Sequence, residues 1–534
     1  MKGIRRLICL LLVMVLLTGC DLFQFLEAFS SIENIQTNPT LSYTRPDIDE
    51  HDRVLQRVCQ SVREETDFDA LLDSIYEYYD VYDLFQGNAH LAYIYYCSDT
   101  TDTYWSQEND YCTKHATTVD AGLESLNYAL AASPLRQQLE SEDYFGAGFF
   151  DAYEGENQWE DPQLLALMEK ESQLINRFYS LSDCYYDDDY ATDSWFAEYE
   201  PQMGEVLVEL VQVRQQQAEY FGYDSYPQFA YDYYHYRDYT PQQATEYLQQ
   251  VGQTLSDLYE SSEHMAAWNL SYTPSTDSQN FRYVKTVAQA MGGDVEEAFT
   301  FMEENTYYDI AAGKNKYPIS FEVFLPYYNV PFLFMAPEGS IYDRLTFAHE
   351  FGHYANDYLC GGSYAGTDVA EVHSQAMEYL SLLYGKNTTT LTRLKMADSL
   401  STQVEQSAFA LFEHKLYDLQ GEELTVENIH NLYDQICSEF GFDAWDWDSR
   451  DYITIPHFYD RPLYIISYVV SNDLAMQIYQ LETNATGAGL EVYRECLYSC
   501  DSYIMSFAEE YGLESPFAPG RLEALRETFA EAFD

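Results

Sequence analysis

Apolar side chains recur every three or four positions over most of the chain from about Asp67 onward. This spacing places them on one face of a helix, and Leu71–Tyr78 and Leu164–Met168 are typical stripes. Thr240 followed by Pro241 predicts another helix start, because Thr caps a helix N-terminus and Pro is tolerated at its first position. The pattern predicts a mainly α-helical protein.

Two short runs depart from the helical spacing. Ser320–Leu325 and Val330–Met335 are rich in β-branched and aromatic residues, and Pro326–Asn329 separates them. We expect two paired strands in a small antiparallel sheet. Their edge either holds an extended peptide by backbone hydrogen bonds or only supports the fold.

Length and charge narrow the classes of function. A chain of 534 residues can bury a large core, in one big domain or in two lobes that share a cleft. Its 89 acidic and 27 basic residues give a formal charge of −62, which excludes a nucleic-acid partner because phosphates need basic patches. The acidity either serves solubility or draws in cationic and neutral peptides.

The amino terminus predicts export. Three basic residues precede the apolar run Leu7–Leu17, which is too short to span a bilayer comfortably and has the layout of a secretory signal. The run ends in Leu17-Thr18-Gly19-Cys20, which resembles the lipobox of bacterial lipoproteins. We therefore expect residues 1–19 to be a signal peptide and residues 20–50 a tether. Lipid-modified Cys20 would then attach the protein to the outer face of the cell membrane, with a mature charge of −65.

Eight cysteines remain outside the signal and the predicted anchor. An even number in an exported protein permits disulfides, although eight cysteines allow 105 complete pairings. Cys97 and Cys112 bracket a polar loop and are the first candidates for a bond. The alternative is that both are buried free thiols.

The stretch Thr346–Ala355 contains the pattern His-Glu-x-x-His within a predicted helix. Side chains four positions apart lie on one helix face, so His349 and His353 can bind one metal ion. Glu350 lies to the side, where a carboxylate can take the proton of a water that attacks a carbonyl. The alternative is two surface histidines on an acidic helix.

Two histidines hold zinc poorly, and a catalytic zinc normally has a third protein ligand. Glu371, eighteen residues beyond His353 on a second predicted helix, is the favoured ligand. Asp368 shares the face of Glu371 but suits helix capping, whereas His373 faces elsewhere. Glu378, two turns further along, either hydrogen-bonds a ligand histidine or is an exposed helix residue.

With these residues in place, the sequence resembles the thimet oligopeptidase and oligoendopeptidase F family of zinc metallopeptidases. The resemblance covers roughly residues 200–530. Its segments, in chain order, are Val213–Ala218, Gly222–Tyr226, Val330–Met335, Phe347–His353, Ala370–Gln375, Ile455–Tyr459 and Pro462–Tyr468. Two features depart from the family: the loop between His353 and Glu371 is short, and His373 stands where a small residue or Pro is usual.

The resemblance implies a large, mainly helical two-lobed peptidase with a deep channel and a small antiparallel sheet beside the zinc helix. It implies one Zn²⁺ per chain, with the proton of the attacking water taken by Glu350. It also implies contacts to the transition state from the late segment, in which Tyr468 is the first candidate, Tyr464 the second, and His457 bonds the same region.

The expected activity is a metalloendopeptidase that cuts internal bonds of short peptides and acts as a monomer. The expected regions are a helical lobe over residues 51–205 and a catalytic region over residues 206–534. One alternative is a peptidyl-dipeptidase or carboxypeptidase-like exopeptidase on the same scaffold. The other is a lipoprotein that binds peptides without cleaving them.

Overall fold

The computed structural model describes residues 40–141, 145, 148–155, 157, 161–182, 184, 190–362, 365–445 and 447–533. The predicted signal peptide, Cys20 and the first part of the tether lie outside this range. Within it, helices predominate, so the predicted mainly α-helical class is confirmed. None of the helices in the described range is both long and apolar enough to cross a membrane.

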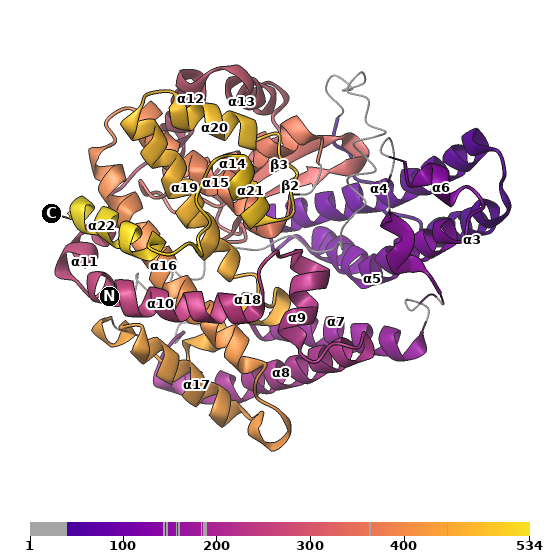
Figure 1. Ribbon diagram of the computed structural model, residues 1–534, viewed down its shortest axis with the longest axis horizontal. Coiled ribbons are helices and arrows are strands. Elements are labelled where there is room, and N and C mark those ends of the chain that lie inside the picture. Colours follow the sequence, from indigo (N-terminus) through magenta and orange to yellow (C-terminus); the bar gives the residue numbers. More distant parts are fainter. Residues whose placement is uncertain are drawn as a thin grey trace.

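Three long helices near the amino terminus form a unit with its own hydrophobic core. They are α3 (Ile48–Glu64), α4 (Phe68–Ser98) and α5 (Thr103–Ala131), and short α6 (Arg136–Leu139) follows them. Their apolar stripes meet around Val58 and Ile75, which are almost completely buried. This unit occupies the indigo and purple right-hand side of Figure 1.

A second and larger core joins most of the remaining elements. The remaining helices all contribute to this core except α11. They are α7 (Pro162–Ser182), α8 (Asp193–Tyr220), α9 (Tyr226–Ala230), α10 (Pro241–Tyr259), α11 (Ser262–Trp268), α12 (Asp277–Met291), α13 (Gly293–Asn305), α14 (Asp343–Cys360), α15 (Thr367–Tyr384), α16 (Thr389–Leu416), α17 (Val426–Glu439), α18 (His457–Asp460), α19 (Ile466–Asn484), α20 (Ala488–Cys496), α21 (Ile504–Glu510) and α22 (Arg521–Phe533). The boundary expected between residues 205 and 206 falls inside continuous helix α8.

The two strands form at the predicted residues, as β2 (Ser320–Leu325) and β3 (Val330–Met335). They pair antiparallel, with Phe321 opposite Phe334. A two-residue strand, β1 (Tyr308–Asp309), adds to the other side of β3 in parallel, so the described sheet is mixed rather than purely antiparallel. Strand β2 lies at one edge of the sheet, and both α4 and α14 pack against it (Figure 1).

The predicted metal-binding helix, α14, begins at Asp343. The Asp343 carboxylate accepts hydrogen bonds from the backbone N–H groups of Glu338, Gly339 and Ser340, which ties the incoming chain to the first turn. The Ser340 hydroxyl accepts a further hydrogen bond, from the Tyr342 N–H.

Helices α14 and α15 touch backbone to backbone at Gly352. A Cβ atom on Gly352 would lie 2.6 Å from the carbonyl oxygen of His373 and 2.6 Å from the Cα of Ser374. Real Cβ atoms do not approach backbone atoms this closely, so only glycine permits the contact. Because the two helices approach so closely here, His349 and His353 on α14 face the first turns of α15.

The proposed disulfide between Cys97 and Cys112 does not form. Both thiols are free and buried. Cys97 belongs to the larger core, whereas the sulfur of Cys112, on α5, lies 4.0 Å from the hydroxyl of Tyr43. Burial raises the pKa of the Cys112 thiol to about 11, which keeps it protonated. The alternative prediction, that both cysteines are buried free thiols, is confirmed.

Candidate metal centre

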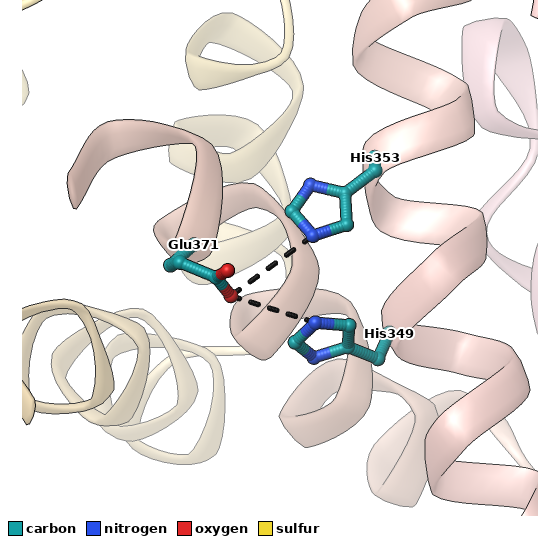
Figure 2. A group of neighbouring side chains, drawn as sticks. All are labelled: His349, His353 and Glu371. Carbon is teal, nitrogen blue, oxygen red and sulfur yellow. Dashed lines mark ion pairs between the residues drawn. The ribbon is translucent and has the colours of Figure 1, made fainter. Parts of the chain in front are cut away.

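His349 and His353 project from one face of α14 toward Glu371 on α15, as Figure 2 shows. The Nε2 atoms of His349 and His353 lie 3.4 Å and 3.9 Å from the same Glu371 oxygen, Oε2. One donor atom from each of the three residues lies within 4.8 Å of the other two. The structure thus brings together the three ligands that the sequence favoured.

The arrangement of these donors fits zinc. Two donors on a tetrahedral zinc ion, with bonds of about 2.0–2.2 Å, lie about 3.3–3.6 Å apart, close to both nitrogen–oxygen distances. Two imidazoles and one carboxylate are also a known ligand set of catalytic zinc, which leaves a fourth position open. The donor set therefore suits a catalytic ion better than a structural one.

Glu378 hydrogen-bonds the ring nitrogen of His349 that lies away from Glu371. The Nδ1–H of His349 donates to Glu378 Oε1 over 2.8 Å, which turns the Nε2 lone pair toward Glu371. Lys395 on α16 donates to the other Glu378 oxygen over 2.7 Å and to Asp398 over 2.9 Å. Asp398 also accepts from the Tyr342 hydroxyl. Glu378 is buried, so it is not an exposed helix residue. It hydrogen-bonds a predicted ligand histidine, which is the other role considered for it.

The acidic surroundings stabilise positive charge at His349. Burial by itself would lower the pKa of His349, but the hydrogen bond to Glu378 and the charges of Glu371, Glu378 and Glu350 raise it to about 9. Burial lowers the pKa of His353 well below its usual value. The pair therefore carries at most one positive charge near neutral pH, and the carboxylates around it supply the negative charge that a divalent cation needs.

Glu371 is fixed by groups on both sides. The hydroxyl of Tyr464 donates to its Oε1 over 2.7 Å, and that of Ser374 donates to its Oε2 over 3.1 Å. Its pKa is raised by burial, which these two hydrogen bonds and the charge of His349 oppose. Both hydroxyls orient the carboxylate without occupying the space between the histidines.

The two competitors for the third ligand position face other partners. Asp368 forms an ion pair with Arg237, over 3.2 Å, and accepts from the Tyr239 and Ser467 hydroxyls. The ring of His373 packs 6.2 Å from that of Phe507, and burial lowers its pKa to about 4. Neither belongs to the group of donors that could hold a metal.

Glu350 is buried beside the ligands. Burial raises its pKa to about 7, and the charges of Glu371 and Glu378 act in the same direction, whereas the charge of His349 opposes them. The backbone N–H of Glu322, on edge strand β2, also lowers the pKa by hydrogen-bonding the carboxylate. A carboxyl group with a pKa near 7 can both accept and release a proton at neutral pH.

The late segment adds three polar side chains to the same region. The rings of His457 and Tyr468 lie 6.2 Å apart, and those of Tyr464 and Tyr468 lie 5.3 Å apart. Within the described residues, His457 Nε2 and the Tyr468 hydroxyl are buried without a hydrogen-bond partner. Burial and the charge of Arg461 lower the pKa of His457 to about 3, which keeps the ring neutral. Of the three, Tyr464 is the one that contacts a predicted ligand.

Buried cations hold the loop that presents these side chains. Arg214 on α8 donates to the carbonyl oxygens of Phe458 and Tyr459, directly after His457. Arg237 donates to the carbonyl oxygen of Leu463 over 2.8 Å. The Leu463 N–H in turn donates to Glu413 on α16 over 2.8 Å. Leu463 has a φ of +65°, a conformation that a non-glycine residue keeps only where its surroundings enforce it.

The sequence interpretation missed the groups that support the ligands, namely Lys395, Asp398, Arg237 and Glu413. Each acts across a long separation in sequence, so no local pattern relates it to the histidines. One signal was available for Lys395, which stands between Leu394 and Met396 in an apolar part of a helix. A basic side chain at a core position of so acidic a chain indicates a buried carboxylate partner.

The chain matches two family models. Residues 39–159 match the peptidase M3 N-terminal domain, and residues 230–524 match peptidase family M3. The first match extends the likeness into a part of the chain where the sequence shows no recognisable motif. No curated protein matches the chain in sequence.

Several solved structures share the fold. One assigned to oligoendopeptidase F has a TM-score of 0.78 at 20% identity, over 92% of this chain and 98% of its own. PZ peptidase A with an inhibitor has a TM-score of 0.78 at 19% identity, over 92% and 98%. One assigned to oligoendopeptidase F from Bacillus anthracis has a TM-score of 0.75 at 19% identity, over 93% and 98%. At such identities the likeness establishes the fold alone.

The carboxylate behind His349 gives a first prediction. Glu378→Gln removes the charge that faces Lys395 and weakens the alignment of His349, so we expect zinc affinity to fall about 10–100-fold. Competition for zinc against a chelating dye measures the change. Exposed Glu422→Gln is the matched control and should leave affinity unchanged. Equal affinity in both variants would remove Glu378 from the site.

Proposed function

The chain belongs to peptidase family M3, and on that premise we propose that this metallopeptidase is a zinc-dependent endopeptidase of short peptides. The observation that carries the proposal is the convergence of His349, His353 and Glu371, backed by Glu378 and flanked by Glu350. A protein that only binds peptides has no need of this set. The family and the geometry together favour hydrolysis over simple capture.

Glu350 is the group that handles protons. A zinc ion bound by the three ligands would lower the pKa of a water molecule and polarise a carbonyl group. Glu350, with a pKa raised to about 7, accepts the proton that the water loses. The same carboxyl group then releases this proton to the amine that leaves when the peptide bond breaks.

The late segment supplies hydrogen bonds to the developing oxyanion. The Tyr468 hydroxyl and His457 Nε2 are buried and lack protein partners among the described residues, so both are available to a substrate. The Tyr464 hydroxyl is committed to Glu371 and acts by orienting that ligand. We therefore assign Tyr468 to the oxyanion, with His457 beside it.

The edge of β2 supports cleavage within a peptide. An edge strand offers unpaired backbone groups, which bind an extended peptide regardless of its sequence and leave both of its ends unrestricted. Glu322 on this strand already directs one N–H to Glu350, which relates the strand to the proton acceptor. An exopeptidase would instead need a group that recognises a chain terminus.

We further propose that the protein acts outside the cell, attached to the membrane through a lipid on Cys20. The support is the sequence of residues 1–20, with basic residues, an apolar run and the Leu-Thr-Gly-Cys ending. Extracellular peptides short enough to enter the site would then be its substrates.

Replacement of Glu350 tests the chemistry. Glu350→Gln keeps the shape of the side chain but cannot accept a proton, so peptide hydrolysis should fall by about 10²–10⁴-fold while zinc stays bound. A fluorogenic peptide assay and metal analysis by mass spectrometry check the two parts. Treatment of the unaltered protein with a chelator should abolish activity, and zinc should restore it. Normal cleavage by Glu350→Gln would overturn the mechanism.

The position of the cut distinguishes the two kinds of peptidase. An endopeptidase should cleave a ten-residue peptide internally and should still do so after both termini are blocked. Mass spectrometry of the products, sampled at early times, identifies the bonds. Release of dipeptides or single residues from one end only, with no cleavage of the blocked peptide, would instead establish the exopeptidase.

Replacement of Cys20 tests the anchor. Cys20→Ala removes the thiol that carries the lipid, so the protein should lose incorporated fatty acid and leave the membrane fraction. Labelling with a fatty acid analogue, followed by fractionation, measures both. Unchanged membrane association of the variant contradicts the anchor and leaves the peptidase assignment intact.

A further inference from the structure

A cavity lies beside the proposed metal ligands. His349, His457 and Tyr468 form part of its wall, so it opens next to the position of the reacting bond. The unpartnered polar atoms of His457 and Tyr468 belong to its lining, which indicates a surface prepared for a polar ligand.

The rest of the cavity lining combines apolar and acidic groups. Trp268, Phe409, Ile455 and Pro456 supply flat apolar surface. Glu378, Lys395, Asp398 and Glu405 supply the charges, three negative and one positive, when all four are ionised. A long side chain with an apolar stem and a cationic head matches this combination.

The charges in the cavity do not balance. Lys395 hydrogen-bonds both Glu378 and Asp398, so its ammonium group is already shared between two carboxylates. Glu405 stands two turns beyond Asp398 on the same helix and forms no ion pair with any described residue. It accepts a hydrogen bond from the Tyr259 hydroxyl over 2.9 Å and is 9% exposed. A buried carboxylate without a cation is costly, and a ligand that brings one removes the cost.

The protonation of Glu405 is consistent with this imbalance. Burial raises its pKa to about 7, the charge of Asp398 acts in the same direction, and the hydroxyls of Tyr259 and Ser401 oppose both. A bound cation would favour the ionised form. No part of the proposed proton transfer uses Glu405.

We propose that this cavity binds a cationic group of the substrate, an ammonium or guanidinium, with Glu405 as its counter-ion. This assignment rests on the proposed peptidase function and specifies its substrates. The group comes from a lysine or arginine side chain near the cleaved bond or from the peptide's own amino terminus. The net charge of −62 assists, because it concentrates cationic peptides around the protein.

A binding experiment tests this without relying on cleavage. The protein is the Glu350→Gln variant with zinc bound, and calorimetry measures its affinity for three peptides of equal length. One is amino-terminally acetylated and carries a single lysine, one replaces that lysine by norleucine, and one has norleucine and a free amino terminus. The lysine position is scanned along the peptide.

We expect the lysine peptide, at one position, to bind about 10–100-fold more tightly than its norleucine partner. Addition of Glu405→Gln should abolish this difference, and thermal unfolding followed by circular dichroism shows whether the variant is folded. Preference for the free amino terminus would identify that group as the cation. Equal affinity for all three peptides overturns the proposal.

Kinetics on the unaltered protein keep this proposal separate from the function. Loss of the lysine preference in kcat/KM in the Glu405→Gln variant supports the pocket. Exposed Glu422→Gln should change neither value. Cleavage without a preference for either lysine or a free amino terminus refutes the pocket and retains the peptidase. Selective binding of one of these cations without any cleavage refutes the peptidase and retains the pocket.

Discussion

The backbone contact between α14 and α15 at Gly352 is the constraint on which the site depends. The donors come from two helices, which must be held in register. The contact does this, because a Cβ at Gly352 would lie 2.6 Å from backbone atoms of His373 and Ser374. Glu371 stands one turn before that contact on α15, opposite the two histidines. Packed helices behave as rigid bodies, so this one glycine fixes the spacing of all three ligands.

Charge neutralisation is the second requirement, and it explains where the scarce basic residues lie. Only 27 of 534 residues are Lys or Arg, yet Lys395, Arg214 and Arg237 are almost completely buried around the site. Each contacts a carboxylate, and the two arginines also bind loop carbonyl oxygens. Isolated buried carboxylates would bind protons or destabilise the fold. Basic side chains therefore neutralise carboxylates inside the protein, although acidic residues far outnumber basic ones in the chain as a whole.

The local parts of this architecture could be predicted from sequence, and the long-range parts could not. Helix periodicity, strands β2 and β3 and the His349–His353 spacing depend on neighbours within a few residues. Glu371 was found because catalytic zinc needs a third ligand and a second helix follows closely. Glu413 acts on Leu463, 50 residues along the chain, no repeated spacing relates Lys395 to Glu378, and strand β1 is only two residues long. The Cys97–Cys112 prediction was wrong because a polar loop between two cysteines says nothing about which core each thiol enters.

The late loop combines strain with unsatisfied polar atoms, and both features suit catalysis. Leu463 keeps a left-handed backbone that costs of order 1–3 kcal/mol, held by Arg237 on its carbonyl oxygen and Glu413 on its N–H. The next residue, Tyr464, is thereby placed on Glu371. One helical turn later, the Tyr468 hydroxyl is buried without a partner among the described residues. A buried donor left unpaired in the free protein gains most from an acceptor that forms during the reaction, so an oxyanion is favoured over the uncharged carbonyl that precedes it.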